Sequence, residues 1–285
     1  MMDHPVWQFT NQMPEGRAFE IYHATNTTPQ PTIYQSHHFY ELYFILQGSI
    51  RVIVEDADVS PAIGDVLIYP PHCMHRVTHT DPSLPYERFY IYLSNEFLQS
   101  ISTPEVDFIN ALQQLTDGHR YCLQPGEAAV RELVPMADEI IAAARDTSPE
   151  AVLANRCRMT IYLLQVLDTL RQSIPAAAES SSRMNGLIRY INQNAAQPLT
   201  LDMLADVFGI SKYALLHEFK SYTGMPIYQY ILTRRVILAQ QLIQQGAKPR
   251  EACQQSGFTN YPSFYRAFKA RTGKSPNQCA KGSGE

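Results

Sequence analysis

A short pattern of helix caps and turn glycines occurs twice in the C-terminal third of the chain. In residues 199–224, Thr200 and Ser211 are of the kind that cap helices, and Gly209 between them suits a left-handed turn. Ala205, four positions before this glycine, is small enough to let two helices approach closely. The pattern predicts two short helices packed across a tight turn, which is a helix-turn-helix.

The second copy lies in residues 247–273, where Ala252 takes the place of Ala205 and Gly257 that of Gly209. The inward-facing positions of the second helix also correspond, with Leu215 and Phe219 matched by Phe264 and Phe268. Both copies end in a Thr-Gly pair. A single copy would carry little weight, but two copies with the same core positions indicate a pair of helix-turn-helix units.

The segment between the two units, residues 226–245, is expected to be helical. As one helix it would be about 30 Å long. Successive major-groove faces of B-form DNA lie about 34–36 Å apart. A rigid helix of this length could therefore set two recognition helices into adjacent segments of the groove on one face of double-stranded DNA.

Charge is divided unevenly along the chain. The net charge of −4 taken alone argues against binding to nucleic acid. Residues 1–182, however, contain 10 Arg, no Lys and 22 acidic residues, a balance of −12, whereas residues 183–285 contain 13 basic and 5 acidic residues, a balance of +8. This asymmetry indicates that the C-terminal part meets a polyanion and the N-terminal part does not.

Several other classes of protein are excluded by composition. No apolar run approaches the ~18 residues that a membrane span needs, and the first residues lack the pattern of a signal peptide. The cysteines are odd in number, scattered and without a CxxC pair: Cys73, Cys122, Cys157, Cys253 and Cys279. We therefore expect free thiols, no disulfide or zinc finger, no membrane partner and a cytoplasmic location.

The acidic part begins with short strands over residues 33–95. Apolar and aromatic runs separated by glycine and proline predict an antiparallel sandwich or barrel; the runs are Tyr40–Leu46, Ile50–Val54, Val66–Tyr69 and Tyr86–Leu93.

Helical spacing begins at Glu127. Residues 127–145 and 150–171 are expected to be helices, and Pro135 is expected to bend or end the first. Further helices are predicted at 184–194, 201–207, 212–222, 226–244, 249–255 and 261–271. The expected fold has two domains: an all-β barrel followed by helices, and an all-α domain with two helix-turn-helix units. The expected boundaries are 1–125 for the barrel, 126–173 for a helical connector, 174–183 for a linker and 184–280 for the DNA-binding domain.

The C-terminal part resembles the AraC/XylS family of bacterial regulators over residues 184–278. The positions that carry the resemblance are Leu204-Ala205, Ser211, Leu215, Phe219-Lys220, Thr223-Gly224, Tyr230, Arg235, Ala239, Gly257-Phe258, Phe264, Phe268-Lys269, Gly273 and Ser275-Pro276. The resemblance implies a ligand-responsive, sequence-specific DNA-binding transcriptional regulator. Activation through RNA polymerase is the expected mode, and repression is the alternative.

The family's DNA-facing positions correspond to Lys212, Tyr213, Leu216, His217 and Lys220 in the first unit and to Tyr261, Pro262, Ser263, Tyr265, Arg266 and Lys269 in the second. Arg266 and His217 suit base edges, and Lys220 and Lys269 suit phosphates. The alternative is that these are solvated surface charges. Because Leu216 stands where a polar reader is common and Glu218 adds negative charge near the helix, the first unit is expected to read DNA more weakly or through shape.

The acidic part resembles a cupin barrel. His37 to Glu41 is followed by Gly48, and Gly64-Asp65 by Pro70, His72 and His75, in the order of the two cupin motifs. The resemblance implies His37, Glu41 and His75 as possible ligands of a divalent metal, with Gln35 in the place of a further histidine. The expectation is nevertheless a barrel that requires no cofactor, in which these residues bind a ligand or one another, and the metal site is the alternative. The same motifs leave open a metal-dependent cupin enzyme fused to a DNA-binding domain, although we expect no enzyme.

Alternation places Glu41, Tyr43 and Ile45 on one strand face and Arg88, Tyr90 and Tyr92 on another. With His37 and His75, these residues would form a pocket for a polar effector such as a sugar or a carboxylate, although the rings could equally be barrel core. A barrel that binds another protein remains a third possibility.

In the family, the helices after the barrel commonly form a homodimer interface. The stripe that could supply it comprises Leu163, Leu164, Val166, Leu167 and Leu170. The alternative is that this stripe packs on its own barrel.

Overall fold

The computed structural model describes residues 7–9, 13–14, 16–28, 33–175 and 183–281. The chain divides into two compact units. The N-terminal unit comprises Thr10–Thr32 and Ser36–Glu179, and the C-terminal unit comprises Met1–Phe9, Ile33–Gln35 and Ser180–Glu285. Most of the predicted linker, residues 174–183, lies outside the described residues.

The N-terminal unit is built on antiparallel strands, as predicted. One sheet has the order β11-β10-β7-β4-β9-β2, formed by β2 (Phe19–Asn26), β4 (Tyr40–Gln47), β7 (Val66–Tyr69), β9 (Tyr86–Leu93), β10 (Cys122–Gln124) and β11 (Ile174–Pro175). Facing strands pair in the order β8-β5-β6, formed by β5 (Ile50–Val54), β6 (Ala57–Val59) and β8 (His75–His79). Two further short strands are β1 (Trp7–Phe9) and β3 (Tyr34–Ser36).

Strand β4 is buried on both faces from Tyr40 to Leu46. Its outward-facing residues, Leu42, Phe44 and Leu46, belong to a core shared with the helices. Phe44 stacks on Phe89 of β9 with ring centroids 4.0 Å apart. The alternate residues face the barrel interior, as the period of a strand requires.

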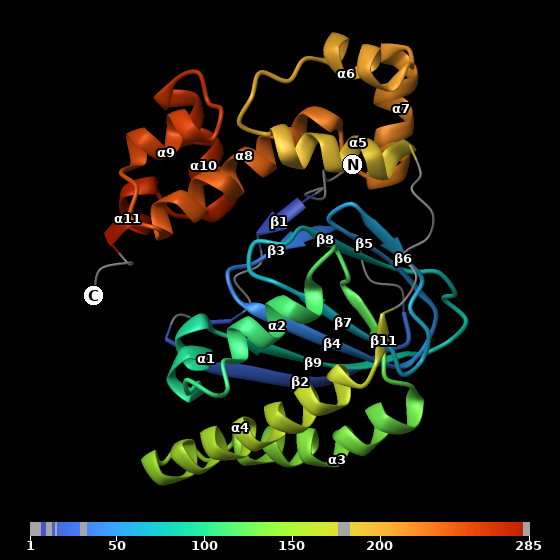
Figure 1. Ribbon diagram of the computed structural model, residues 1–285, viewed down its shortest axis with the longest axis vertical. Helices are drawn as coiled ribbons and strands as arrows, with labels where there is room; N and C mark the ends of the chain where they lie inside the picture. Colours follow the sequence, from blue (N-terminus) through green and yellow to red (C-terminus); the bar gives the residue numbers. More distant parts are fainter. Residues whose placement is uncertain (1–6, 10–12, 15, 29–32, 176–182, 282–285) are drawn as a thin grey trace. The chain divides into compact units, whose positions relative to one another are not determined.

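Four helices cover the outer face of the six-stranded sheet: α1 (Asn95–Ile101), α2 (Phe108–Thr116), α3 (Glu127–Ala143) and α4 (Pro149–Arg171). Figure 1 shows α3 and α4 lying next to each other. Helix α3 does not end at Pro135, which lies exposed on its outer side, so the carbonyl group four residues earlier can face water. Gly64 (φ +87°) lets the barrel approach the start of α3, since a Cβ there would lie 2.2 Å from the Glu127 backbone nitrogen.

The leucine stripe of α4 is core rather than surface for most of its length. Leu163, Val166, Leu167 and Leu170 are buried against the unit's own sheet and helices. Leu164 alone of the five predicted positions is exposed, at 45%. For four of the five positions the alternative therefore holds, which is packing on the chain's own barrel, because one helix face cannot cover the barrel and a partner together.

The C-terminal unit consists mainly of helices, and those at the predicted positions are α5 (Arg183–Asn194), α6 (Leu201–Phe208), α7 (Lys212–Thr223), α8 (Ile227–Gln244), α9 (Pro249–Gln255) and α10 (Tyr261–Thr272). A further helix, α11 (Pro276–Lys281), was not predicted. Thr200 and Ser211 cap α6 and α7 through their hydroxyl oxygens, and Gly209 has a left-handed conformation (φ +63°). In the second helix-turn-helix unit, Asn260 caps α10 and Gly257 (φ +83°) makes the turn. Both helix-turn-helix units, and with them the predicted fold class, are confirmed.

Within the described part of the chain, no helix combines the length and apolarity needed to cross a membrane.

Candidate functional sites

Helix α7 presents one exposed face that consists of predicted DNA-contacting residues. Leu215 and Phe219 are fully buried on the opposite face. Lys212, Tyr213, Leu216, His217 and Lys220 are all exposed. Tyr213 is 80% exposed, and its ring lies nearly parallel to that of His217 at 6.3 Å.

Lys212 differs from the other members of this face because its ammonium group forms an ion pair with Asp202 of α6. A phosphate contact by Lys212 would have to compete with this carboxylate. Sequence reasoning missed the pair because nothing in the spacing of the two residues requires that they meet.

Helix α10 divides the second set of predicted residues between surface and core. Arg266 and Lys269 are exposed, as is Pro262 in the first turn. Tyr261, Ser263 and Tyr265 are half-buried. The Tyr261 ring packs edge-on against Phe264, with ring centroids 5.5 Å apart, at the border of the hydrophobic core of the second helix-turn-helix unit. Part of the ring surface is therefore buried and not available to DNA.

Helix α8 joins the two helix-turn-helix units and, with 18 residues, is about 27 Å long. A loop beside it adds a brace that the sequence did not predict. Arg235 of α8 donates from Nε to the carbonyl of Ala195 and from a terminal nitrogen to that of Gln197, each at 2.9 Å. Gly257 lies against the same loop, because a Cβ on it would be 2.7 Å from the Ala196 carbonyl oxygen. The turn of the second helix-turn-helix unit is thus held against the loop that leads from α5 into the first.

Inside the barrel, the imidazole rings of two histidines meet one carboxyl group. His37 Nε2 lies 2.8 Å and His75 Nε2 lies 3.5 Å from the same oxygen of Glu41. One ligand atom from each residue lies within 4.8 Å of the other two, and all three side chains are buried. The rings stack on Phe39 and on Tyr69 respectively, which fixes their planes.

The outer ring nitrogens determine the tautomers. His37 Nδ1 is 2.8 Å from the Phe39 carbonyl oxygen and His75 Nδ1 is 3.3 Å from that of Cys73. Because a carbonyl oxygen only accepts, both Nδ1 atoms carry hydrogen and both neutral rings turn an Nε2 lone pair toward Glu41. Burial lowers the pKa of both histidines and raises the pKa of Glu41. Burial raises the pKa of Glu41 to about 7, so near neutral pH both the protonated and the ionised form of its carboxyl group face two neutral imidazoles.

The other predicted effector residues lie farther along the same interior. Tyr43 stacks on Tyr90 at 5.7 Å, and the Arg88 guanidinium lies over the rings of Tyr86 and Tyr90. The Tyr86 hydroxyl donates to that of Tyr43 at 2.7 Å. Thus His37, Glu41 and His75 form one group and Tyr43, Arg88 and Tyr90 form another, both facing the barrel interior.

Three residues of this interior were missed as site candidates: Tyr69, His79 and Tyr86. Alternation along β7, β8 and β9 could have indicated them. Among the described residues, no group forms a hydrogen bond with the Tyr69 hydroxyl, His79 Nε2 or Arg88 Nε, although all three atoms are buried. Buried polar atoms of this kind normally have a partner, so the interior retains hydrogen-bonding capacity.

Two family models match the chain. An AraC-like ligand binding domain matches residues 18–167, and a helix-turn-helix domain matches residues 204–282. The chain is 24% identical over 267 residues to the HTH-type transcriptional activator RhaS from Enterobacter sp. (strain 638), covering 89% of this chain and 90% of the relative. It is 25% identical over 232 residues to the uncharacterized HTH-type transcriptional regulator YbfI from Bacillus subtilis (strain 168), covering 79% and 78%.

Among solved structures, ToxT from Vibrio cholerae aligns over 93% of this chain and 98% of its own, with 12% identity and a TM-score of 0.39. The DNA-binding domain of AdpA in complex with a target DNA aligns over 36% of this chain and 93% of its own, with 21% identity and a TM-score of 0.35. The assignment does not depend on these two likenesses, because one family model alone spans more than half of the chain and the second matches the paired helix-turn-helix units. The chain belongs to the AraC family of transcriptional regulators, with an AraC-like ligand-binding domain followed by a helix-turn-helix domain.

Proposed function

We propose that this regulator reads two short motifs of double-stranded DNA with α7 and α10 and activates transcription, in contact with RNA polymerase, in response to a small polar molecule bound in its barrel. The observation that carries the proposal is the exposed face that each of the two helices presents on one compact unit. Activation is favoured by the likeness to RhaS, which is a transcriptional activator by name. The division of the chain at residues 125, 173 and 183 and a cytoplasmic location are parts of the same proposal.

Arg266 is the base-reading residue in this proposal. Its guanidinium is exposed on α10, and within the described ranges no side chain forms an ion pair with it. A free guanidinium can donate two parallel hydrogen bonds to a guanine edge, whereas the ammonium of Lys269 is a point charge suited to phosphate. Tyr265 and Ser263 flank Arg266 on the same helix, and Tyr213, His217 and Lys220 are the corresponding contacts of α7.

Replacing Arg266 with alanine is expected to relax base preference in one of the two motifs and to cost roughly 1–3 kcal/mol of binding free energy on the preferred site. Lys269→Ala is the matched control: it should weaken binding about equally on all sequences and reduce the salt dependence. The measurement is selection of bound sequences from random duplex DNA, followed by titration of the best site at two salt concentrations. A uniform loss for Arg266→Ala across all sequences would contradict its role.

The effector site is the barrel interior, with His37, Glu41, Tyr43, His75, Arg88 and Tyr90 as its polar groups. Support comes from the aromatic rings that alternate with these groups and from the buried polar atoms that lack partners among the described residues. Rings with a few convergent donors suit a polar metabolite such as a sugar.

The cluster of His37, Glu41 and His75 also fits a divalent transition metal ion. Two imidazole Nε2 lone pairs and one carboxylate oxygen converge, and both Nδ1 atoms are held by backbone carbonyl groups, as in the outer shell of many metal sites. Such an ion would supply positive charge and open positions for oxygen atoms of an effector. The metal site is a separate proposal from the effector site, because the same three side chains can also form a hydrogen-bonded cluster without an ion.

Glu41→Gln tests the metal proposal. The amide can still donate to His37 Nε2, so we expect the fold to survive while the anionic ligand is lost. The metal-stripped parent chain should take up about one Zn²⁺ or Mn²⁺ per chain and melt at a higher temperature with it, and Glu41→Gln should do neither. His79→Ala, on the same strand as His75 but outside the cluster, is the control. Metal content of the parent equal to that of Glu41→Gln would leave only the hydrogen-bonded cluster.

We propose that a homodimer forms through the exposed face of α4, which shares only Leu164 with the predicted stripe. Leu153, Cys157, Ile161 and Leu164 are exposed and follow one another at helical spacing. Glu150 and Arg171, also exposed, lie near the two ends of this stripe. A second copy packed antiparallel would bring Glu150 opposite Arg171 at both ends, and this charge complementarity favours a copy of the same chain as the occupant.

A further inference from the structure

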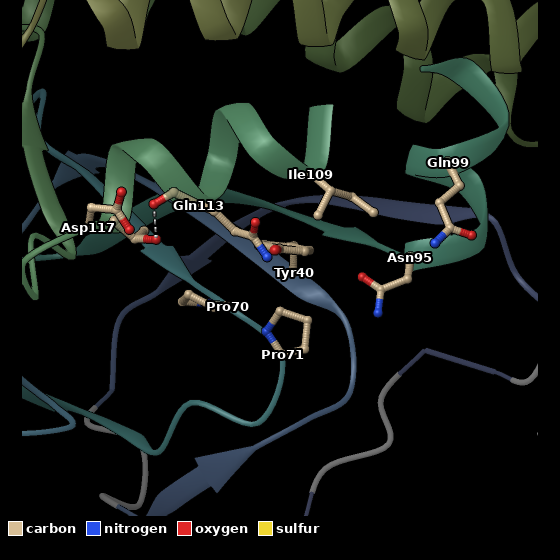
Figure 2. A pocket seen from close by; sticks show the side chains of 9 residues that line it. Tyr40, Pro70, Pro71, Asn95, Gln99, Ile109, Gln113 and Asp117 are labelled. Carbon is tan, nitrogen blue, oxygen red and sulfur yellow. Dashed lines mark hydrogen bonds between the residues drawn. The ribbon is translucent and has the colours of Figure 1, made fainter. Parts of the chain in front are cut away.

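We propose that the N-terminal unit has a second small-molecule site, in an outer cleft between α1, α2 and the Pro70-Pro71 turn, and that it takes a neutral polyhydroxylated molecule of monosaccharide size. The cleft is open to solvent and has a volume of about 440 Å³, within the range of small-molecule sites. Figure 2 shows the side chains that line it: Tyr40, Pro70, Pro71, Asn95, Gln99, Ile109, Gln113, Thr116 and Asp117.

The cleft is distinct from the barrel interior. It lies at one end of three neighbouring strands of the six-stranded sheet. There β4 starts at Tyr40, and its antiparallel neighbours β7 and β9 end just before Pro70 and Ser94. Tyr40 belongs to the outer core under the helices, and the next residue, Glu41, faces the interior. The proposal therefore stands independently of the interior effector site.

The polar side chains of the cleft have hydrogen-bonding capacity to spare. Of the residues that the structure describes, none forms a hydrogen bond or ion pair with the side chains of Asn95, Gln99 or Asp117. The amide of Gln113 lies beside Tyr40 (Figure 2). Amides both donate and accept, as hydroxyl groups do, so three amides and one carboxylate match a ligand with several hydroxyl groups.

The remaining lining determines the charge and shape of the ligand. No Lys or Arg lines the cleft, and Asp117 is its one charged residue, which disfavours phosphates and carboxylates. Pro70, Pro71, Tyr40 and Ile109 supply apolar surface. A lining that combines apolar surface with amides suits a sugar ring, which presents both C–H groups and hydroxyl groups.

The cleft adjoins the interior cluster along the chain. Pro71 precedes His72, whose backbone N–H donates to the His37 carbonyl at 2.6 Å. A molecule seated against Tyr40 and Pro71 thus touches the segment that carries His37 and Glu41 and the segment that leads to His75. Occupancy of the outer cleft would bear on the interior site through these segments.

The test uses the full chain and ligand-observed NMR with D-glucose, D-galactose, D-xylose, D-glucuronate and D-glucosamine. We expect saturable binding of at least one neutral sugar, weakened at least tenfold by the double variant Asn95→Ala/Gln99→Ala. Gln99 is exposed and Asn95 is half-buried, and neither side chain has a partner among the described residues, so the fold should be unaffected. Gln114→Ala, exposed on the same helix as Gln113, is the matched control and should bind normally.

Each other outcome overturns the proposal. Binding that survives the double variant but is lost in Arg88→Ala would assign the sugar to the barrel interior. Binding of glucuronate or glucosamine alone would refute the neutral class, and no binding of any of the five would refute the site.

Discussion

Replacing Gly257 with alanine is expected to destabilise the C-terminal unit far more than the same change at Gly209, although both glycines make the turn of a helix-turn-helix. Both have positive φ, so alanine costs about 1–2 kcal/mol of backbone strain at either position. A Cβ at Gly209 meets nothing within 4 Å. At Gly257 it would lie 2.7 Å from the Ala196 carbonyl oxygen and 2.9 Å from that of Ala195.

These obstacles are backbone atoms, so the second helix-turn-helix unit has to move away from the loop to make room for a Cβ. We expect a further cost of roughly 1–3 kcal/mol, as for other overpacked sites. Displacement of α10 should also remove specific binding at the motif that α10 reads. The measurements are chemical denaturation of the full chain and titration of sites with either motif scrambled. Equal losses at the two glycines would show that the loop at Ala195 to Gln197 is no brace.

Replacing either of two adjacent leucines of α4 with alanine is expected to change a different property: the folding free energy at Leu163 and dimer formation at Leu164. Leu163 is 2% exposed in the core between the six-stranded sheet and the helices, so Leu163→Ala should cost about 2–5 kcal/mol of folding free energy. Leu164 lies on the exposed stripe with Leu153 and Ile161, so Leu164→Ala should change stability by no more than about 0.5 kcal/mol. If the stripe binds a second copy, Leu164→Ala should raise the dissociation constant of the dimer.

Sedimentation velocity over a range of concentrations, together with denaturation, separates the two effects. Leu163→Ala is the control, because it makes the same leucine-to-alanine change but leaves the exposed stripe intact. A Leu164→Ala chain that dimerises as tightly as the parent, with Ile161→Ala behaving likewise, would exclude this face as the interface.

Elements with strong local signals could be predicted from the sequence. Thr200, Gly209 and Ser211 bracket α6 and α7 because caps and left-handed turns depend on residues within a few positions of one another. The two faces of β4 could be predicted for the same reason, since strand period alone separates Glu41 from Leu42. The short helices α1 and α2 were missed, because neither is long enough to show a clear helical period.

Contacts between distant residues were decided only in the tertiary structure. Sequence spacing identified the leucines of α4 as an apolar stripe, but the barrel determined which of them it buries. The pairing of Lys212 with Asp202, the loop that holds Arg235 and Gly257, and the cleft under α1 and α2 each join segments whose separation along the chain carries no signal. The local code of caps, turns and alternation thus determined which elements form and which residues they expose or bury, whereas shape and charge across the packed elements determined which residues meet.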